Sequence, residues 1–324
     1  MNAQRFQVLD SWRGISILLV LAAHLMPIGP KELKLNHSAG MLGMAFFFTL
    51  SGFLITHFLL NHSSVLDFLI RRFFRIIPLA WLYMALVLYL NQSPIDTWLA
   101  HMLFYANYPP KPLIIVTDHM WSLCVEMQFY IGIALMVALL RKRGLYLLPS
   151  LCVAITLCRV SNEVYFSVIT HYRVDEILVG CSLALIYNNK LGSYGSLFVA
   201  RVSCPLLLVL LLISCHPNSG FMNYFRPYLA ALLVGNTLFN QQSRLVRLLN
   251  NRILFYIASI SYALYVIHPL LSNTWLGSGD IIEKYTKRPL LFASMFVLGH
   301  LSTYYFERRW ITLGKQLSEK MCRK

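Results

Sequence analysis

His24 is the most informative candidate for a functional residue in this sequence. It interrupts an apolar stretch over residues 15–29. An ionisable group at membrane depth costs roughly a few kcal/mol to insert, so it usually faces a protein interior or a wet cavity. Arg13 lies eleven residues earlier, which returns both side chains to one helix face about 16 Å apart. We interpret His24 as a functional histidine; the alternative is a core histidine hydrogen-bonded to a neighbouring helix.

A second polar stripe follows residue 118. Ser122, Glu126 and Tyr130 are spaced four residues apart, and His119 precedes Glu126 by seven, so all four share one helix face. Glu126 is expected roughly 8 Å below the outer membrane edge, at a depth similar to that of His24. A His–carboxylate pair of this kind can act as a general base with its orienting partner. The alternative is a structural buried hydrogen bond.

Three arginines, Arg71, Arg72 and Arg75, precede the apolar segment 77–90. Guanidinium groups bind phosphate oxygens in pairs, so the cluster predicts a phosphate site on the cytoplasmic rim. The alternative is a topological anchor that contacts lipid headgroups. Pro78 is predicted in the opening turn of that span.

Two further groups lie near the ends of later segments. Ser261, Tyr265 and His268 share a helix face, and a functional and a packing role fit them equally. Arg173 and Glu176 are spaced for an ion pair within one helix at the outer mouth of the sixth span.

The elements that must position these residues are membrane helices. The chain is 57% hydrophobic and only 13% charged, whereas a soluble domain carries about 25% charged residues. We therefore predict an all-α membrane protein, a polytopic bundle of about ten transmembrane helices. The apolar segments are 15–29, 41–60, 77–90, 120–140, 145–158, 174–187, 202–215, 227–239, 253–274 and 289–306.

Charge placement predicts the orientation of this bundle. With both termini in the cytoplasm, most of the 28 Lys and Arg fall on the inner side. The net charge of +15 is then a topology signal, and no soluble basic face is available for nucleic acid. The first span lacks a small-residue cleavage pattern, so we expect it to be retained.

We expect residues 1–324 to form a single transmembrane domain, with no soluble extracytoplasmic domain. The seven cysteines are scattered and mostly within spans, which is typical of small apolar packing residues. We therefore predict neither a metal site nor disulfides.

These motifs resemble the acyltransferase-three family of integral membrane acyltransferases. They occur in the family's order and span nearly the whole chain. The motifs are Asp10-x-x-Arg13-Gly14 with His24, Ser51-Gly52-Phe53, Arg71-Arg72-x-x-Arg75-Ile76-x-Pro78, His119-x-Trp121-Ser122-Leu123-x-x-Glu126-x-x-Phe129-Tyr130, and Ser261-Tyr262-x-x-Tyr265-x-x-His268-Pro269.

The resemblance implies a multi-pass enzyme of the bacterial cytoplasmic membrane. It would move an acyl group, usually acetyl from acetyl-CoA, onto a hydroxyl of a cell-envelope polysaccharide or glycolipid sugar. By the same likeness, the three arginines match the donor motif, Arg13 and His24 match an essential pair, and Glu126 matches the acidic residue. Trp12 departs from the family, which commonly has Leu there. Without an esterase-like domain, either a separate extracytoplasmic transferase relays the acyl group or the bundle acts on its acceptor directly.

Residues and resemblance together predict one mechanism. CoA phosphates bind the inner arginines and Arg13 holds the donor. His24 deprotonates the sugar hydroxyl or briefly carries the acyl group, while Glu126 fixes its tautomer. Another acyl group such as succinyl remains open. The rival class is a transporter or flippase with a His/Glu proton relay, although the chain lacks the internal repeat typical of transporters.

Overall fold

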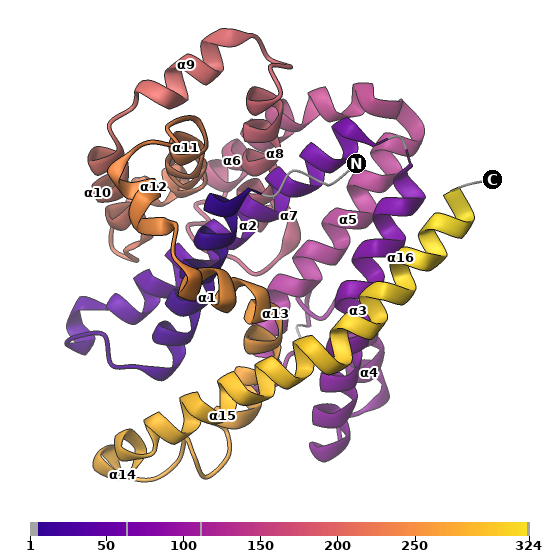
Figure 1. Ribbon diagram of the computed structural model, residues 1–324. Coiled ribbons are helices and arrows are strands. Elements are labelled where there is room, and N and C mark those ends of the chain that lie inside the picture. Colours follow the sequence, from indigo (N-terminus) through magenta and orange to yellow (C-terminus); the bar gives the residue numbers. More distant parts are fainter. Residues whose placement is uncertain (1–5, 63, 111, 323–324) are drawn as a thin grey trace. The chain divides into compact units, whose positions relative to one another are not determined.

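The structure is a computed structural model that describes residues 6–62, 64–110 and 112–322, and within these ranges it contains helices and no strand (Figure 1). The chain divides into two units. The first comprises the described residues of 1–61, 142–167 and 171–261, and the second those of 62–141, 168–170 and 262–324. Each unit positions a different subset of the candidate residues.

The first unit contains most of the helices. They are α1 (Gln7–Leu25), α2 (Leu35–Asn61), α6 (Leu148–Ser161), α8 (Asp175–Tyr187), α9 (Ser193–Arg201), α10 (Cys204–Cys215), α11 (Arg226–Phe239), α12 (Arg244–Leu249) and the first half of α13 (Arg252–Ser272), with short 3-10 turns at Lys31–Leu33 and Gly220–Phe225. The four-residue helix α7 (Thr170–Arg173) leads into α8.

The central helix of the first unit is α2, which packs against both α1 and α8. Glycine residues, which have no side chain, allow the backbones of α2 and α8 to lie this close together. An ideal Cβ on Gly52 would lie 1.9 Å from the Ile177 carbonyl oxygen, and one on Gly180 would lie 2.1 Å from the Thr49 carbonyl oxygen. Because any side chain at either position would overlap the facing backbone, Gly52 of the Ser51-Gly52-Phe53 motif is required for helix packing.

The start of α1 is anchored by buried polar contacts. The Trp12 indole donates to the Thr237 hydroxyl at 3.0 Å, and its ring packs 4.5 Å from that of Phe46. The Ser16 hydroxyl donates to the Gly43 carbonyl at 2.8 Å. These contacts fix the rotation of α1, and therefore the direction in which its polar residues face.

The second unit is built around α3. Its helices are α3 (Val65–Leu90), α4 (Ile95–Met102), α5 (Trp121–Leu140), the second half of α13, α14 (Ile281–Thr286), α15 (Arg288–Leu301) and α16 (Arg308–Cys322), with a 3-10 turn at Asp118–Met120 and a π-helical turn at Ser302–Glu307. A further 3-10 segment, Arg141–Leu147, connects α5 to α6.

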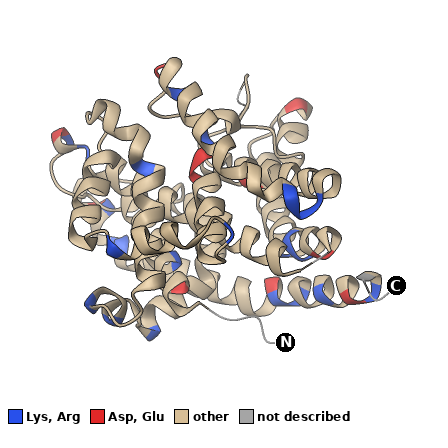
Figure 2. Cartoon of the chain, turned by 90° about the horizontal axis from the view of Figure 1, so that it is seen from above, with Lys and Arg blue, Asp and Glu red and all other residues tan. Residues whose placement is uncertain are grey.

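The C-terminal helix α16 runs beside α3 (Figure 1). Gly314 lies against Phe74, and the Ser318 hydroxyl donates to the Asp67 carboxylate. Lys and Arg recur along α16, as Figure 2 shows for the helix that ends at the C-terminus. This helix is amphipathic, with Ser318 buried while Lys315 is exposed.

Five helical stretches among the described residues are long and apolar enough to cross a membrane. They are Gln7–Leu25, Lys31–Asn61, Val65–Leu90, Asp118–Ser161 and Arg252–Ser272. The pair α9 and α10, bent by 85°, brings the number to six if it forms one span. The chain is therefore a multi-pass membrane protein, whereas the count of ten and the cytoplasmic termini stay predictions.

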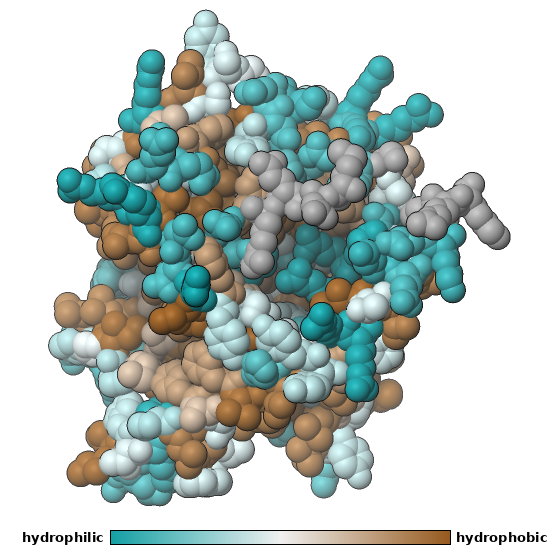
Figure 3. All heavy atoms as spheres, in the orientation of Figure 1, coloured by the Kyte–Doolittle hydropathy of each residue, from teal (hydrophilic) through white to brown (hydrophobic). Residues whose placement is uncertain are grey.

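The exposed surface agrees with a lipid environment. Leu206, Val209 and Leu212 of α10 are each about half exposed, with fractions of 53%, 54% and 49%. Figure 3 shows apolar side chains over much of the face in view. Since a water-soluble protein rarely exposes such contiguous apolar surface, these side chains are suited to contact lipid.

Two predicted helix limits were wrong. Helix α1 ends at Leu25, not at residue 29, because Pro27 and the left-handed Gly29 follow it, and His24 therefore lies exposed in its last turn. Helix α3 begins at Val65, so Pro78 lies inside the helix and not in its opening turn. Interior prolines are tolerated in membrane helices because neighbouring groups satisfy the freed carbonyl.

Candidate active site

Helix α5 presents a buried carboxyl group to α3. Tyr130 donates its phenolic hydrogen to Glu126, one turn earlier on the same helix. Glu126 is only 5% exposed and Tyr130 is fully buried. The edge of the Phe68 ring packs on Tyr130 at 5.7 Å. The i, i+4 spacing seen in the sequence therefore becomes a real hydrogen bond that orients Glu126.

The arginine motif of α3 lies beside this pair. The Arg72 guanidinium carbon stands 5.8 Å from the centroid of the Tyr130 ring, within the range of a cation–π contact. Arg75 interacts electrostatically with Glu307 and Glu126. Two guanidinium groups and a carboxyl group are thus gathered in one place within the second unit.

Arg71 is held differently from its two neighbours. It forms an ion pair with Asp67, one turn earlier, and its side chain remains 38% exposed. Asp67 also accepts the hydroxyl hydrogen of Ser318 from α16. The C-terminal helix therefore reaches the arginine motif through Asp67, a link that had no signal in the sequence because Ser318 is remote along the chain.

The sequence predicted the arginines on the cytoplasmic rim and Glu126 near the outer edge, whereas the structure places Arg72 and Arg75 close to the Tyr130–Glu126 pair. The prediction followed from starting the third helix at residue 77, which left the arginines on a rim. Because α3 begins at Val65, Arg72 and Arg75 lie two to three turns inside the helix, where antiparallel α5 brings Glu126 alongside them.

A second polar cluster joins the 3-10 turn at Asp118–Met120 and α5 to α13. Tyr265 donates to the His119 carbonyl, and its hydroxyl oxygen lies 2.5 Å from that of Ser122. The His119 and His268 rings lie 5.2 Å apart. His119 Nε2 donates to the Val266 carbonyl at 3.3 Å, and His268 Nδ1 donates to the Tyr265 carbonyl at 2.7 Å. The bonds of Tyr265 and His119 tie α13 to the start of α5, whereas the His268 bond lies within α13.

An amide cluster lies on α5 next to Glu126 and was missed in the sequence. The Gln128 amide donates to the Asn107 side-chain oxygen at 3.0 Å and to the Phe104 carbonyl at 2.7 Å. The Thr170 hydroxyl donates to the Gln128 side-chain oxygen at 2.5 Å. Gln128 follows Glu126 by two residues, which placed it off the polar stripe that drew attention.

In the first unit, His24 is oriented by its own helix. Its Nδ1 lies 2.8 Å from the Val20 carbonyl oxygen, which can only accept, so Nδ1 carries the hydrogen. In the neutral ring, Nε2 then carries the lone pair. The Asn36 amide donates to the Ala23 carbonyl at 2.8 Å and to the Met26 carbonyl at 2.6 Å, and so fixes the end of the helix that bears His24.

The remaining residues of the first motif lie at the other end of α1. Arg13 and Asp10 form an ion pair at 3.7 Å, and both side chains are about one-fifth exposed. One continuous helix carries Arg13 and His24, which confirms the helical spacing assumed for them.

On α13, the Ser261 hydroxyl donates to the Ala258 carbonyl of the same helix at 2.8 Å. His24 and Glu126 belong to different units, so their pairing stays a prediction.

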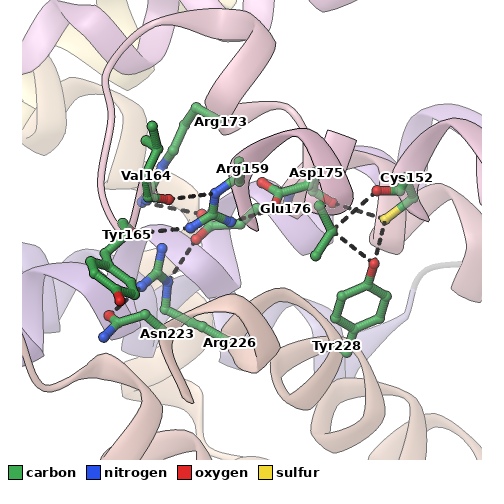
Figure 4. A network of polar contacts seen from close by, with 11 residues as sticks. Cys152, Arg159, Val164, Tyr165, Arg173, Asp175, Glu176, Asn223, Arg226 and Tyr228 are labelled. Carbon is green, nitrogen blue, oxygen red and sulfur yellow. Dashed lines mark hydrogen bonds and ion pairs between the residues drawn. The ribbon is translucent and has the colours of Figure 1, made fainter. Parts of the chain in front are cut away.

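A buried ionic network surrounds the start of α8 (Figure 4). The predicted pair of Arg173 with Glu176 is confirmed at 3.2 Å, and Arg226 binds the same carboxylate at 2.8 Å. Arg159 forms an ion pair with Asp175. All five side chains are at most 1% exposed. The sequence indicated only the local pair, because Arg159 and Arg226 come from other helices.

Aromatic rings also contact Arg173. Its guanidinium carbon lies 5.4 Å from the Phe166 ring centroid and 5.9 Å from that of Phe48. Burial lowers the pKa of Arg173 to about 10, while the charge of Glu176 acts in the opposite direction. The guanidinium therefore stays charged at neutral pH.

The remaining candidates for chemistry in the described ranges are cysteines and metal-ligating side chains. The cysteines described are free thiols, and the side chain of Cys322 lies outside the described part of the chain. Among the residues described, no group of three His, Cys, Asp or Glu side chains could hold a metal ion.

Comparison with known proteins places these residues in context. The sequence model of the family described as an acyltransferase domain matches residues 6–308. YrhL of Bacillus subtilis, provisionally named a peptidoglycan O-acetyltransferase, is 27% identical over 320 residues, covering 80% of this chain and 47% of its own length. The peptidoglycan O-acetyltransferase OatA of Listeria monocytogenes is 24% identical over 359 residues, covering 92% of this chain and 54% of its own.

The chain thus spans about half the length of these relatives. No solved structure matches it. The family match includes every candidate residue described above, from Asp10 on α1 to His268 on α13.

Proposed function

Because this chain belongs to the acyltransferase-three family of acyltransferase domains, we propose that it transfers an acyl group, in the first place acetyl, from acyl-CoA to a hydroxyl of a cell-envelope sugar. The name of OatA supports peptidoglycan as the first acceptor to test. The membrane would be the bacterial cytoplasmic membrane, and a separate extracytoplasmic transferase could take over the acyl group.

One observation carries the donor half of this proposal. Arg72 and Arg75 face the Tyr130–Glu126 pair in a single unit, with Arg72 held over the Tyr130 ring. Guanidinium groups bind phosphate oxygens through two parallel hydrogen bonds, and CoA carries several phosphates. In our proposal Arg72 and Arg75 bind these phosphates, while Arg71, already paired with Asp67, contributes less.

His24 supplies the acid–base chemistry in this proposal. Because Nδ1 donates to Val20, the neutral ring accepts the hydroxyl proton of the sugar at Nε2. The sugar oxygen then attacks the thioester carbonyl, the C–S bond breaks, and the CoA thiolate leaves. The imidazolium returns its proton to the thiolate, which balances the reaction. The Val20 carbonyl holds the Nδ1 hydrogen in this proposal, and Glu126 contributes to turnover as a carboxyl group oriented by Tyr130.

The test is a labelling reaction with purified protein in nanodiscs. We expect acetyl-CoA carrying a radioactive acetyl group to label a peptidoglycan fragment, and an Arg72→Gln variant to raise KM for acetyl-CoA at least tenfold. Arg247→Gln on α12 is the matched control, because it removes an exposed guanidinium from another helix. Equal losses in both variants would reject the phosphate site, and absence of label with every acceptor and acyl-CoA would reject the transferase proposal.

A further inference from the structure

The buried network around α8 contains more positive than negative charge. Its guanidinium groups are those of Arg159, Arg173 and Arg226, and its carboxylates are those of Asp175 and Glu176. None is more than 1% exposed. Since an uncompensated buried charge is strongly unfavourable, a network with one excess guanidinium calls for a further anion.

The excess charge lies on the side of Arg173 and Arg226. Asp175 forms an ion pair with Arg159, whereas Glu176 forms ion pairs with both Arg173 and Arg226. Arg226 is fully buried, and its Nη2 has no hydrogen-bond partner. It is also the first residue of α11, where the helix dipole repels a cation. The Glu176 carboxylate is therefore shared between two buried cations.

Basic side chains also lie at the exposed edge of this ionic network. His37, exposed at the start of α2, packs against the Phe166 ring at 6.0 Å. Four basic groups act electrostatically on His37: Arg226, Arg173, His216 and Lys34. Buried guanidinium groups and accessible basic side chains thus produce a positive potential at one end of the unit.

We propose that Arg173, Arg226, His37 and Lys34 form a binding site for an anionic oxygen group, either the carboxylate or phosphate of a sugar substrate or the phosphate of a lipid headgroup. Asn36, directly before His37, holds the end of α1 that carries His24. The site is therefore placed to bind the acceptor next to the proposed base. Assigning the anion to the acceptor rests on the proposed function; the site itself does not.

Thermal unfolding of the full chain in nanodiscs of phosphatidylcholine tests the site without requiring turnover. The probes are inorganic phosphate and glucuronate, with glucose as the neutral counterpart of glucuronate. A ligand that binds only the folded state raises the melting temperature. We expect phosphate and glucuronate to raise it and glucose to leave it unchanged.

The deciding variant is His37→Asp, which supplies the missing carboxylate at an exposed position. It should weaken phosphate and glucuronate binding at least tenfold. Lys34→Gln should weaken it less. Asn189→Asp is the control, since it adds the same charge at an exposed position beyond the opposite end of α8.

A second arm identifies the source of the anion. If nanodiscs containing phosphatidylglycerol raise the melting temperature and abolish the response to phosphate, the natural ligand is a lipid headgroup; if they do not, it is the sugar substrate. Equal responses in wild type and His37→Asp, or no response to either anion up to about 100 mM, would overturn the proposal. Label transfer is measured separately, so failure of the site and failure of the transferase activity are distinguished.

Discussion

Tyr130 donates its phenolic hydrogen to Glu126, one helical turn earlier on α5, and both side chains are buried. The same Tyr130 ring lies under the Arg72 guanidinium. One tyrosine therefore joins the carboxyl group of the second unit to its arginine motif. This arrangement separates two functions of Tyr130, the hydroxyl for Glu126 and the ring for Arg72.

A Tyr130→Phe variant keeps the ring and removes the hydroxyl. Because a typical hydrogen bond contributes about 0.5–1.5 kcal/mol, we expect a loss of roughly two- to tenfold in kcat with little change in KM for acetyl-CoA. Steady-state kinetics of acetyl transfer measures both parameters. An increase in KM alone would show that Tyr130 acts through the donor site and not through Glu126.

A His24→Gln variant tests the proposed base. Glutamine can still donate to the Val20 carbonyl but cannot take up a proton, so we expect kcat to fall at least about 100-fold while CoA binding is retained. His171→Gln, at an exposed histidine of the same unit, should keep wild-type activity. Near wild-type turnover in a folded His24→Gln protein would end the catalytic assignment.

The Arg159–Asp175 ion pair should dominate the stability of the first unit. Removing one partner of a buried pair costs about 3–5 kcal/mol, so Asp175→Asn should lower the melting temperature strongly. Combining it with Arg159→Gln should recover part of the loss, because neither charge then remains unpaired. Glu283→Gln, which removes an exposed partner of Lys287, should leave the melting temperature unchanged. Strictly additive losses in the double variant would contradict the pairing.

The contact of α2 with α8 predicts a steric effect at Gly52. A methyl group there would overlap the Ile177 carbonyl, so Gly52→Ala should destabilise the protein by about 1–3 kcal/mol. Gly132→Ala on α5 is the control, because no heavy atom lies within 4 Å of its added Cβ. That substitution should be neutral, or stabilising by up to about 1 kcal/mol through helix propensity. Equal unfolding temperatures for both variants would refute the close contact.

The sequence by itself determined the local features of this protein. Hydropathy predicted α5 at 120–140 and α8 at 174–187, within one residue of their observed bounds. Helical period predicted that Glu126 and Tyr130 share a face, and that Arg173 can reach Glu176. These relationships depend only on residues a turn apart, which the geometry of one helix sets.

Tertiary structure decided which helix faces meet. Nothing in the chain near Arg72 predicts the Tyr130 ring, and nothing near Asp175 predicts Arg159 or, for Glu176, the second partner Arg226. The start of α3 was missed for a related reason, since its first turns carry the charges that lower hydropathy. When a helix is apolar on all sides, its sequence does not indicate which side faces the neighbouring helices. Their facing sides are selected by close backbone contacts such as that of Gly52 with Ile177 and by buried charges that must find partners.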